Sequence, residues 1–179
     1  MQVTARNGSW THESCKIQGM ETDIALDAID LRILQAMQAR GRITYDELAL
    51  GVGLSASAAL RRVKRLEESG VIAGYTALVA PERVGLGLTA YINVRLAKQR
   101  DGDLRSPIDA FAAAVQAWPE VVECAALTGE MDYLLRVLVR DMAHYSHFIM
   151  DSLLKHPAVL DCKTSFLLRR LKGATALPI

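Results

Sequence analysis

The stretch from Thr44 to Tyr75 constrains the fold of this chain more than any other. Thr44 and Glu47 have the T-x-x-E spacing of a capping box, which predicts the start of a short helix. Gly53 can then turn the chain through positive φ, and Ser55 is a typical N-cap for a second helix. Two helices joined in this way indicate a helix-turn-helix, which places its second helix in the major groove of DNA.

The second helix of this stretch is expected to have one apolar face and one basic face. Ala59, Val63 and Leu66 recur at helical spacing and are expected to be buried. Residues early in such a helix are best placed to meet base edges, and later basic residues to meet phosphates. The alternative is a solvated charged face, against which the preceding turn argues. The predicted DNA contacts are Ser55, Ala56, Ser57, Leu60, Arg61, Arg62, Lys64 and Arg65.

The flanking residues complete a winged helix-turn-helix domain over residues 21–80. An earlier helix is predicted to end at Gly41, with Leu26, Ile29, Ile33 and Met37 on one face. A wing strand over Gly70 to Ile72 and Tyr75 to Val79 should follow the basic helix. Residues 81–88 are interpreted as a linker, and the polar residues 1–20 as a disordered extension.

The second half of the chain has the order β-α-β-β-α-β, which predicts a ferredoxin-like domain over residues 89–172, with 173–179 as a tail. Strands are expected at 89–96, 121–128, 133–139 and 159–168, and helices after Ser106-Pro107 and after Asp141. The whole chain is therefore predicted to be α+β. Such a sheet carries helices on one face only. We expect its other face to meet a second copy of the chain in a two-fold dimer.

Composition narrows the function classes. A formal net charge of +1 argues against a bulk polycation but permits a local basic face. Cys15, Cys124 and Cys162 are too few for a disulfide scaffold or a zinc site, and they fit a reducing cytoplasm. Cys124 and Cys162 fall on opposite edge strands of the predicted sheet, so we expect small buried side chains without a bond between them. No run suits a membrane span, and no metal or cofactor motif is present in the sequence.

The ordered motifs resemble those of the Lrp/AsnC family of leucine-responsive, or feast/famine, regulators. The markers include Gly41-Arg42-Ile43, Gly53-Leu54-Ser55, Gly70-Val71-Ile72 and Gly74-Tyr75, with Thr128-Gly129-x-x-Asp132-Tyr133 in the second half. This resemblance implies a winged helix-turn-helix joined to an effector-binding RAM domain. It also implies a homodimer that assembles further, commonly into an octamer, and an amino acid that binds between subunits and changes assembly or DNA affinity.

The turn between the middle strands matches the effector loop of that family. Its backbone N–H groups can bind a carboxylate, and Asp132 can bind an α-ammonium group. An ordinary hairpin turn is the alternative. The predicted effector-binding residues are Thr128, Gly129, Glu130, Met131, Asp132, Met142, Ser165 and Phe166.

Catalysis is not expected. Siroheme decarboxylases resemble the same two-domain layout and give the alternative function, an enzyme that acts on a tetrapyrrole. His144 and His147 have a spacing that metal ligands can adopt, but no acid or cysteine is placed to complete a site. A further alternative is a regulator that has lost DNA binding, against which the retained basic helix argues.

Overall fold

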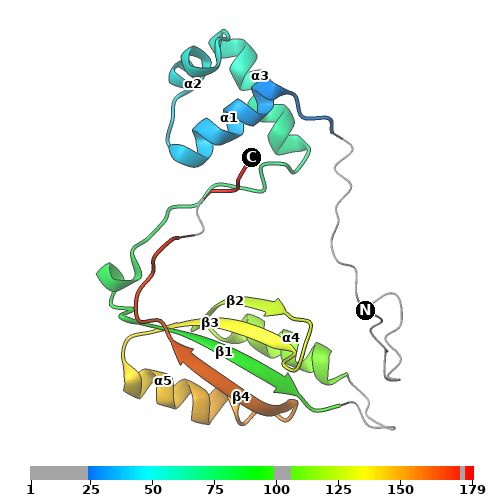
Figure 1. The fold of residues 1–179 in the computed structure, drawn as a ribbon, viewed down its shortest axis with the longest axis vertical. Helices are drawn as coiled ribbons and strands as arrows, with labels where there is room; N and C mark the ends of the chain where they lie inside the picture. The colour runs from blue at the N-terminus through cyan, green and yellow to red at the C-terminus, as the bar shows by residue number, and fades with distance from the viewer. Residues whose placement is uncertain (1–23, 99–105, 174–175) are drawn as a thin grey trace. The chain divides into compact units, whose positions relative to one another are not determined.

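The computed structural model describes residues 24–98, 106–173 and 176–179, so the extension predicted over residues 1–20 lies outside it. The chain divides into two compact units between Thr76 and Ala77, and residues 176–179 belong to the first unit (Figure 1). Within the described residues, no helix has the length and apolar character that a membrane crossing requires.

The first unit is a bundle of three helices: α1 (Ala28–Ala39), α2 (Tyr45–Val52) and α3 (Ala56–Glu68). Its core contains Ile33 from α1, Leu48 from α2, and Val63 and Leu66 from α3, each at most 1% exposed. Three amphipathic helices of this length cannot bury their apolar faces singly, so the fold of the unit depends on this shared core.

The predicted starts of α2 and α3 are confirmed by their caps, whereas Leu26, predicted on the apolar face of the first helix, precedes α1, whose N-cap is Asp27. The Thr44 hydroxyl accepts a hydrogen bond from the Glu47 N–H, and the Glu47 carboxylate accepts one from the Thr44 N–H. Gly53 ends α2 with φ of 74°, a conformation that disfavours side chains with a Cβ. The Ser55 hydroxyl then caps α3 by accepting from the Ala58 N–H at 3.3 Å.

The wing strand predicted after α3 is wrong in detail. Residues 70–79 are all described and contain no strand. The backbone instead turns at Gly70, and the Ile72 N–H donates to the Leu66 carbonyl at 3.0 Å. Leu78 and Val79 in the following chain are exposed, and no strand among the described residues pairs with this segment.

The second unit is a four-stranded antiparallel sheet with helices, and it confirms the ferredoxin-like prediction. After a 3-10 turn (η1, Pro81–Val84), the elements are β1 (Leu88–Leu96), α4 (Pro107–Ala117), β2 (Val121–Ala126), β3 (Tyr133–Val139), α5 (Met142–Phe148) with a π-helical turn (η2, Ile149–Leu153), and β4 (Val159–Phe166). The strand order is β2-β3-β1-β4 (Figure 1).

The two faces of this sheet differ in burial. Alternate residues of the central strands, such as Ile92 and Leu135, are fully buried against Phe111 of α4 and Leu153 of η2. The intervening residues, including Tyr91 and Leu134, are only partly buried. Helices therefore cover one face, and the described part of the chain leaves the other face open.

The two cysteines lie on opposite edge strands, β2 and β4, and both are free, as predicted. The expectation of buried packing holds only in part. Cys162 is partly buried and packs against the core of the second unit. Cys124, in contrast, is exposed, because β2 residues after Val121 have no covering element among the described residues. Partial burial nevertheless raises the pKa of both thiols.

Candidate DNA-reading face and effector turn

The orientation of α3 is determined by its apolar face. Ala59, Val63 and Leu66 are 0% exposed and lie at successive turns of the helix. Because this stripe faces α1 and α2, the residues on the opposite side of α3 must point outward. The Ser55 cap satisfies a backbone N–H at the start of the helix, where base-reading residues of a helix-turn-helix lie.

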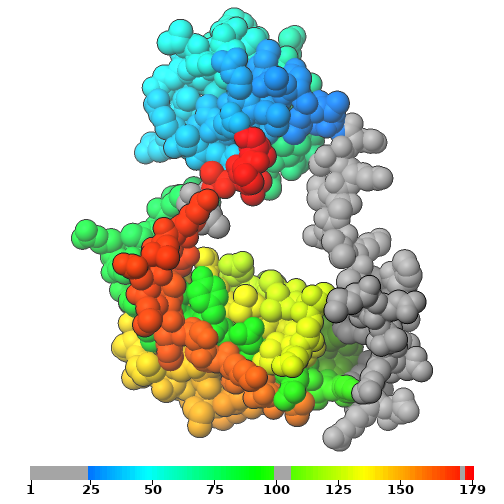
Figure 2. Space-filling view, viewed as in Figure 1, coloured from blue at the N-terminus to red at the C-terminus, as the bar shows by residue number. Residues whose placement is uncertain are grey.

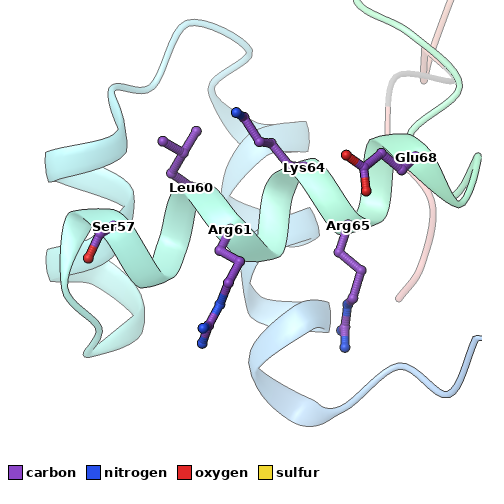
Figure 3. Close-up of a pocket in the computed structure, with 6 residues that line it drawn as sticks. All are labelled: Ser57, Leu60, Arg61, Lys64, Arg65 and Glu68. Carbon is purple, nitrogen blue, oxygen red and sulfur yellow. The ribbon is translucent and has the colours of Figure 1, made fainter.

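The outward side of α3, here called the outer face, is a hollowed surface with basic residues (Figure 3). Arg61 and Arg65 extend in the same direction from successive turns, and Lys64 extends away from them. Arg61 and Lys64 are exposed and take part in no ion pair among the described residues. The residues of the outer face are Ser57, Leu60, Arg61, Lys64, Arg65 and Glu68.

Arg62, and also Arg65 of the outer face, bind the start of α1. Arg62 Nη1 lies 2.8 Å from Asp30 Oδ1 and 2.7 Å from Asp27 Oδ2. Arg65 Nη2 forms an ion pair with Asp30 Oδ2. Asp30 is 0% exposed and is the one buried charged residue of the described chain. A buried carboxylate is tolerated when it is paired and hydrogen-bonded in this way. This group of four residues is called the acid–arginine cluster below.

The acid–arginine cluster also caps α1. Asp27 Oδ1 accepts hydrogen bonds from the N–H groups of Ile29 and Asp30, at 2.9 and 2.8 Å, and Asp30 Oδ2 accepts from the Asp27 N–H at 3.1 Å. These backbone bonds, with the Arg62 guanidinium, lower the pKa of Asp27 to about 2. The hydrogen bonds of the Arg62 guanidinium to the carboxylates of Asp27 and Asp30 raise the pKa of Arg62. The N-terminus of α1 and the middle of α3 are thus joined by hydrogen bonds between charged groups.

The structure therefore gives the predicted DNA contacts different surroundings. Ser57, Leu60, Arg61 and Lys64 lie on the outer face, and Ser55 caps the helix with its hydroxyl 3.2 Å from that of Ser57. Ala56 is half-buried at the first turn. Arg62 and Arg65 have carboxylate partners within the domain. Sequence reasoning missed Asp27 and Asp30 as these partners, although Asp27 and Asp30 have the spacing of a capping box.

The predicted effector turn is a closed loop between β2 and β3. The Leu127 N–H donates to the Asp132 carbonyl at 2.8 Å, and the Asp132 N–H donates to the Val94 carbonyl at 2.9 Å. Asp132 Oδ2 accepts from the Leu96 N–H at 2.7 Å. Gly129 has φ of 127°, while Thr128, Gly129 and Glu130 are exposed. Asp132 therefore holds the turn against the end of β1 with one carboxylate oxygen.

The other predicted effector residues lie at the opposite end of the sheet within one chain. Tyr133, next to the turn, pairs with Val94, whereas Phe166 pairs with Ala90, four residues along β1. Met142 follows the far end of β3. Ser165 and Phe166 are adjacent in β4 and so point to opposite faces. Phe166 packs edge-on against Tyr145, with ring centroids 4.8 Å apart.

The two histidines of α5 do not converge on a common site. His144 Nε2 lies 3.1 Å from Glu120 Oε1, whereas His147 pairs with Asp151 on the exposed side of the helix. In the part of the chain that the structure describes, no group of three or more His, Cys, Asp or Glu side chains is arranged to hold a metal ion.

Comparisons with known proteins match both units. Residues 26–73 match a winged helix-turn-helix DNA-binding model, and residues 89–177 match the Lrp/AsnC ligand binding domain. The chain is 40% identical to a leucine-responsive regulatory protein of Rhizobium meliloti, over 89% of the chain and 100% of the relative. It is 39% identical to the Bkd operon transcriptional regulator of Pseudomonas aeruginosa, over 86% of the chain and 98% of the relative.

A solved structure agrees with these matches. A transcriptional regulator of Neisseria meningitidis, crystallised in complex with L-Met, aligns with a TM-score of 0.81 and 47% identity, covering 86% of this chain and 97% of that one. The three-helix unit, the ferredoxin-like sheet and these relatives together show that the chain belongs to the Lrp/AsnC family of transcriptional regulators.

Proposed function

We propose that the outer face of α3 binds double-stranded DNA in the major groove and that the sheet domain changes DNA affinity or assembly when it binds an amino acid. The observation that carries the DNA proposal is the division of basic residues on α3. Arg62 and Arg65 have carboxylate partners, while Arg61 and Lys64 are exposed without one among the described residues. The helix thus keeps cations on its exposed side after its own packing is satisfied.

The chemistry of these residues suits the two kinds of DNA contact. An arginine such as Arg61 can donate two hydrogen bonds to one guanine edge, and a lysine such as Lys64 can neutralise a phosphate. Ser57 and Leu60 supply a small polar and an apolar contact on the same surface. The helix N-terminus near Ser55 adds a favourable electrostatic end for a phosphate.

An amino acid is the proposed effector. The relatives named above are a leucine-responsive protein and a regulator crystallised with L-Met, which supports this ligand class. In this chain, the exposed turn at Thr128 to Glu130 offers backbone N–H groups, and Asp132 has a second carboxylate oxygen besides the one bound to Leu96. These groups match the α-carboxylate and α-ammonium groups of an amino acid.

A homodimer that assembles further, for example into an octamer, is the proposed state of the protein. The open face of the sheet supports this proposal, because a four-stranded sheet with helices on one side leaves apolar side chains such as Leu134 to be covered. Arg136 Nε on that face is buried without a hydrogen-bond partner among the described residues, and a Glu123 carboxylate oxygen lies 3.5 Å from it. The proposed effector pocket between subunits further requires the second copy to bring Met142, Ser165 and Phe166 of one chain toward the turn of another.

To test this function, the protein is titrated into labelled DNA from upstream of its own gene, and fluorescence anisotropy reports binding. The salt concentration is fixed, and excess competitor DNA is present. We expect tight binding that resists the competitor and that changes when amino acids are added. Coupling of this kind is typically about 5- to 150-fold in affinity. Binding that the competitor removes completely would contradict sequence-specific reading, and binding that no amino acid alters would contradict the effector proposal.

A further inference from the structure

The residues after β4 include a cluster of positive charges that is separate from the outer face of α3. Arg169, Arg170 and Lys172, here called the basic segment, are all exposed and belong to no helix or strand. Beyond Asp161 the sequence contains no acidic residue. The charged side chains after Asp161 are therefore all positive, in a chain whose formal net charge is +1. Figure 2 shows this stretch in orange-red, continuing from the end of β4.

The basic segment gathers three cations within four residues, and none of them has a carboxylate partner within the described residues, whereas some other cations of the second unit do. Arg95 lies 3.3 Å from Asp161, and Lys155 pairs with Asp151. None of the three cations of the basic segment forms an ion pair of this kind with a described residue. Adjacent like charges repel one another, so a local cluster of this kind is best satisfied by an external anion.

The position of the basic segment is fixed at one end. The Leu167 N–H donates to the Thr89 carbonyl at 2.9 Å, which extends the contact of β4 with β1 by one residue. The segment therefore leaves a rigid sheet rather than a free chain. Anchoring lowers the conformational entropy that is lost when such a segment binds a partner.

We propose that the basic segment is a second DNA-binding site, which contacts backbone phosphates and does not read bases. Guanidinium and ammonium groups form charge-assisted hydrogen bonds with phosphate, and such contacts add affinity without sequence information. This inference rests on the proposed DNA binding by α3. It adds that the second unit also contributes to DNA affinity. A second protein copy is the rival occupant, because Leu168 and Leu171 in the same stretch are 98% and 83% exposed.

The first test neutralises the basic segment with R169Q/R170Q/K172Q and measures affinity at several salt concentrations. We expect weaker binding to the specific and to a scrambled duplex by the same factor. The salt slope should fall by about 0.9 for each phosphate that the variant no longer neutralises. The matched control, R83Q/K98Q/K155Q, removes the same charge from exposed sites of the same unit. An unchanged slope, or an equal reduction in the control, would overturn the proposal.

The second test uses the unaltered protein, so it does not depend on how a variant folds or assembles. The lysine amines are acetylated in the presence and in the absence of scrambled duplex DNA, and mass spectrometry measures how far each lysine has reacted. We expect DNA to protect Lys172 and to leave Lys155 reactive. A Lys172 that stays reactive with DNA, or that is already protected in the free protein by another copy, would overturn the proposal. Specific binding that is unchanged in the α3 variant R61A/K64A, with Lys172 still protected by DNA, would instead contradict only the reading by α3.

Discussion

Arg62 Nη1 of α3 lies 2.8 Å from the buried Asp30 Oδ1 of α1, and this contact joins α3 to the first helix of the unit. Arg65 contacts the other oxygen of the same carboxylate. One acid thus binds two arginines that stand a turn apart. Together with the buried apolar stripe of α3, the acid–arginine cluster holds the rotation of this helix about its axis, and with it the direction in which Arg61 and Lys64 point.

Replacing Asp30 with Asn should lower the free energy of unfolding of the helical unit. Asp30 accepts bonds from the Asp27 N–H and from both arginines, whereas an amide has one acceptor oxygen and would present a donor to another donor. We expect a decrease of about 1–3 kcal/mol in urea unfolding. Asp46→Asn, at an exposed position of α2, is the control and should cost less. Equal stability of both variants would show that the cluster contributes nothing.

Acid should destabilise the helical unit through its caps. Contacts lower the pKa of Asp27 from 3.8 to about 2, and the Thr44 N–H with Arg40 lowers the pKa of Glu47 from 4.5 to about 2. A lowered folded-state pKa gives stability that is present above the unfolded pKa and lost as the pH falls toward the folded value. We therefore expect the melting temperature to fall as the pH drops from the ordinary pKa values of these two acids toward about 2.

The acid effect has a direct control. The D27N/E47Q variant lacks the two carboxyl groups that titrate at the starts of α1 and α2. Its melting temperature should therefore depend less on pH over that interval. A variant with the same pH dependence as the original protein would assign the acid sensitivity to other carboxylates.

The core of the helical unit should be sensitive to truncation at Leu66. This side chain is 0% exposed among Ile33, Leu48 and Val63, and its removal leaves a cavity. Leu66→Ala should cost about 2–5 kcal/mol in unfolding free energy. Leu50→Ala, at a site that is 87% exposed, should change it by less than about 0.5 kcal/mol. A small effect at Leu66 would contradict the placement of α3.

Local rules predicted most of this fold. The caps at Thr44, Ser55, Ser106 and Asp141 act within a few residues, so their spacing in the sequence was enough to place the helix starts. The strand order followed from the β-α-β-β-α-β pattern, because few topologies satisfy it. The wing strand failed because a strand needs a partner, and residues 70–79 pair with no strand of the described chain.

Long-range pairing explains what the sequence could not predict about the site. Arg62 and Arg65 looked the same as Arg61 and Lys64 along the chain, and only packing of α1 against α3 gives them Asp30 as a partner. Asp132 was expected at the ligand, yet its contact with the Leu96 N–H depends on how the β2–β3 turn meets β1. Both contacts link residues that are far apart in the sequence.

Asp132 has an observed role at the Leu96 N–H and a proposed role at the α-ammonium group, and substitutions can separate the two. Asn keeps an oxygen that can accept from the Leu96 N–H but lacks the charge for an α-ammonium group. Asp132→Asn should keep the melting temperature within about 2 °C of the original value and should abolish the amino-acid response. Asp132→Ala should lower the melting temperature further and should also abolish the response. A normal response in the Asn variant would place the ammonium site elsewhere.

The most direct test of the proposed reading face is the double variant R61A/K64A, measured for both DNA affinity and unfolding. Both side chains are exposed and without an ion-pair partner in the described chain, so the free energy of unfolding should stay within about 0.5 kcal/mol of the original value. Binding to the specific duplex should weaken by about 1–3 kcal/mol when a base-reading side chain is removed, with a smaller salt slope. Unchanged affinity and an unchanged preference over competitor DNA would contradict reading by the outer face of α3.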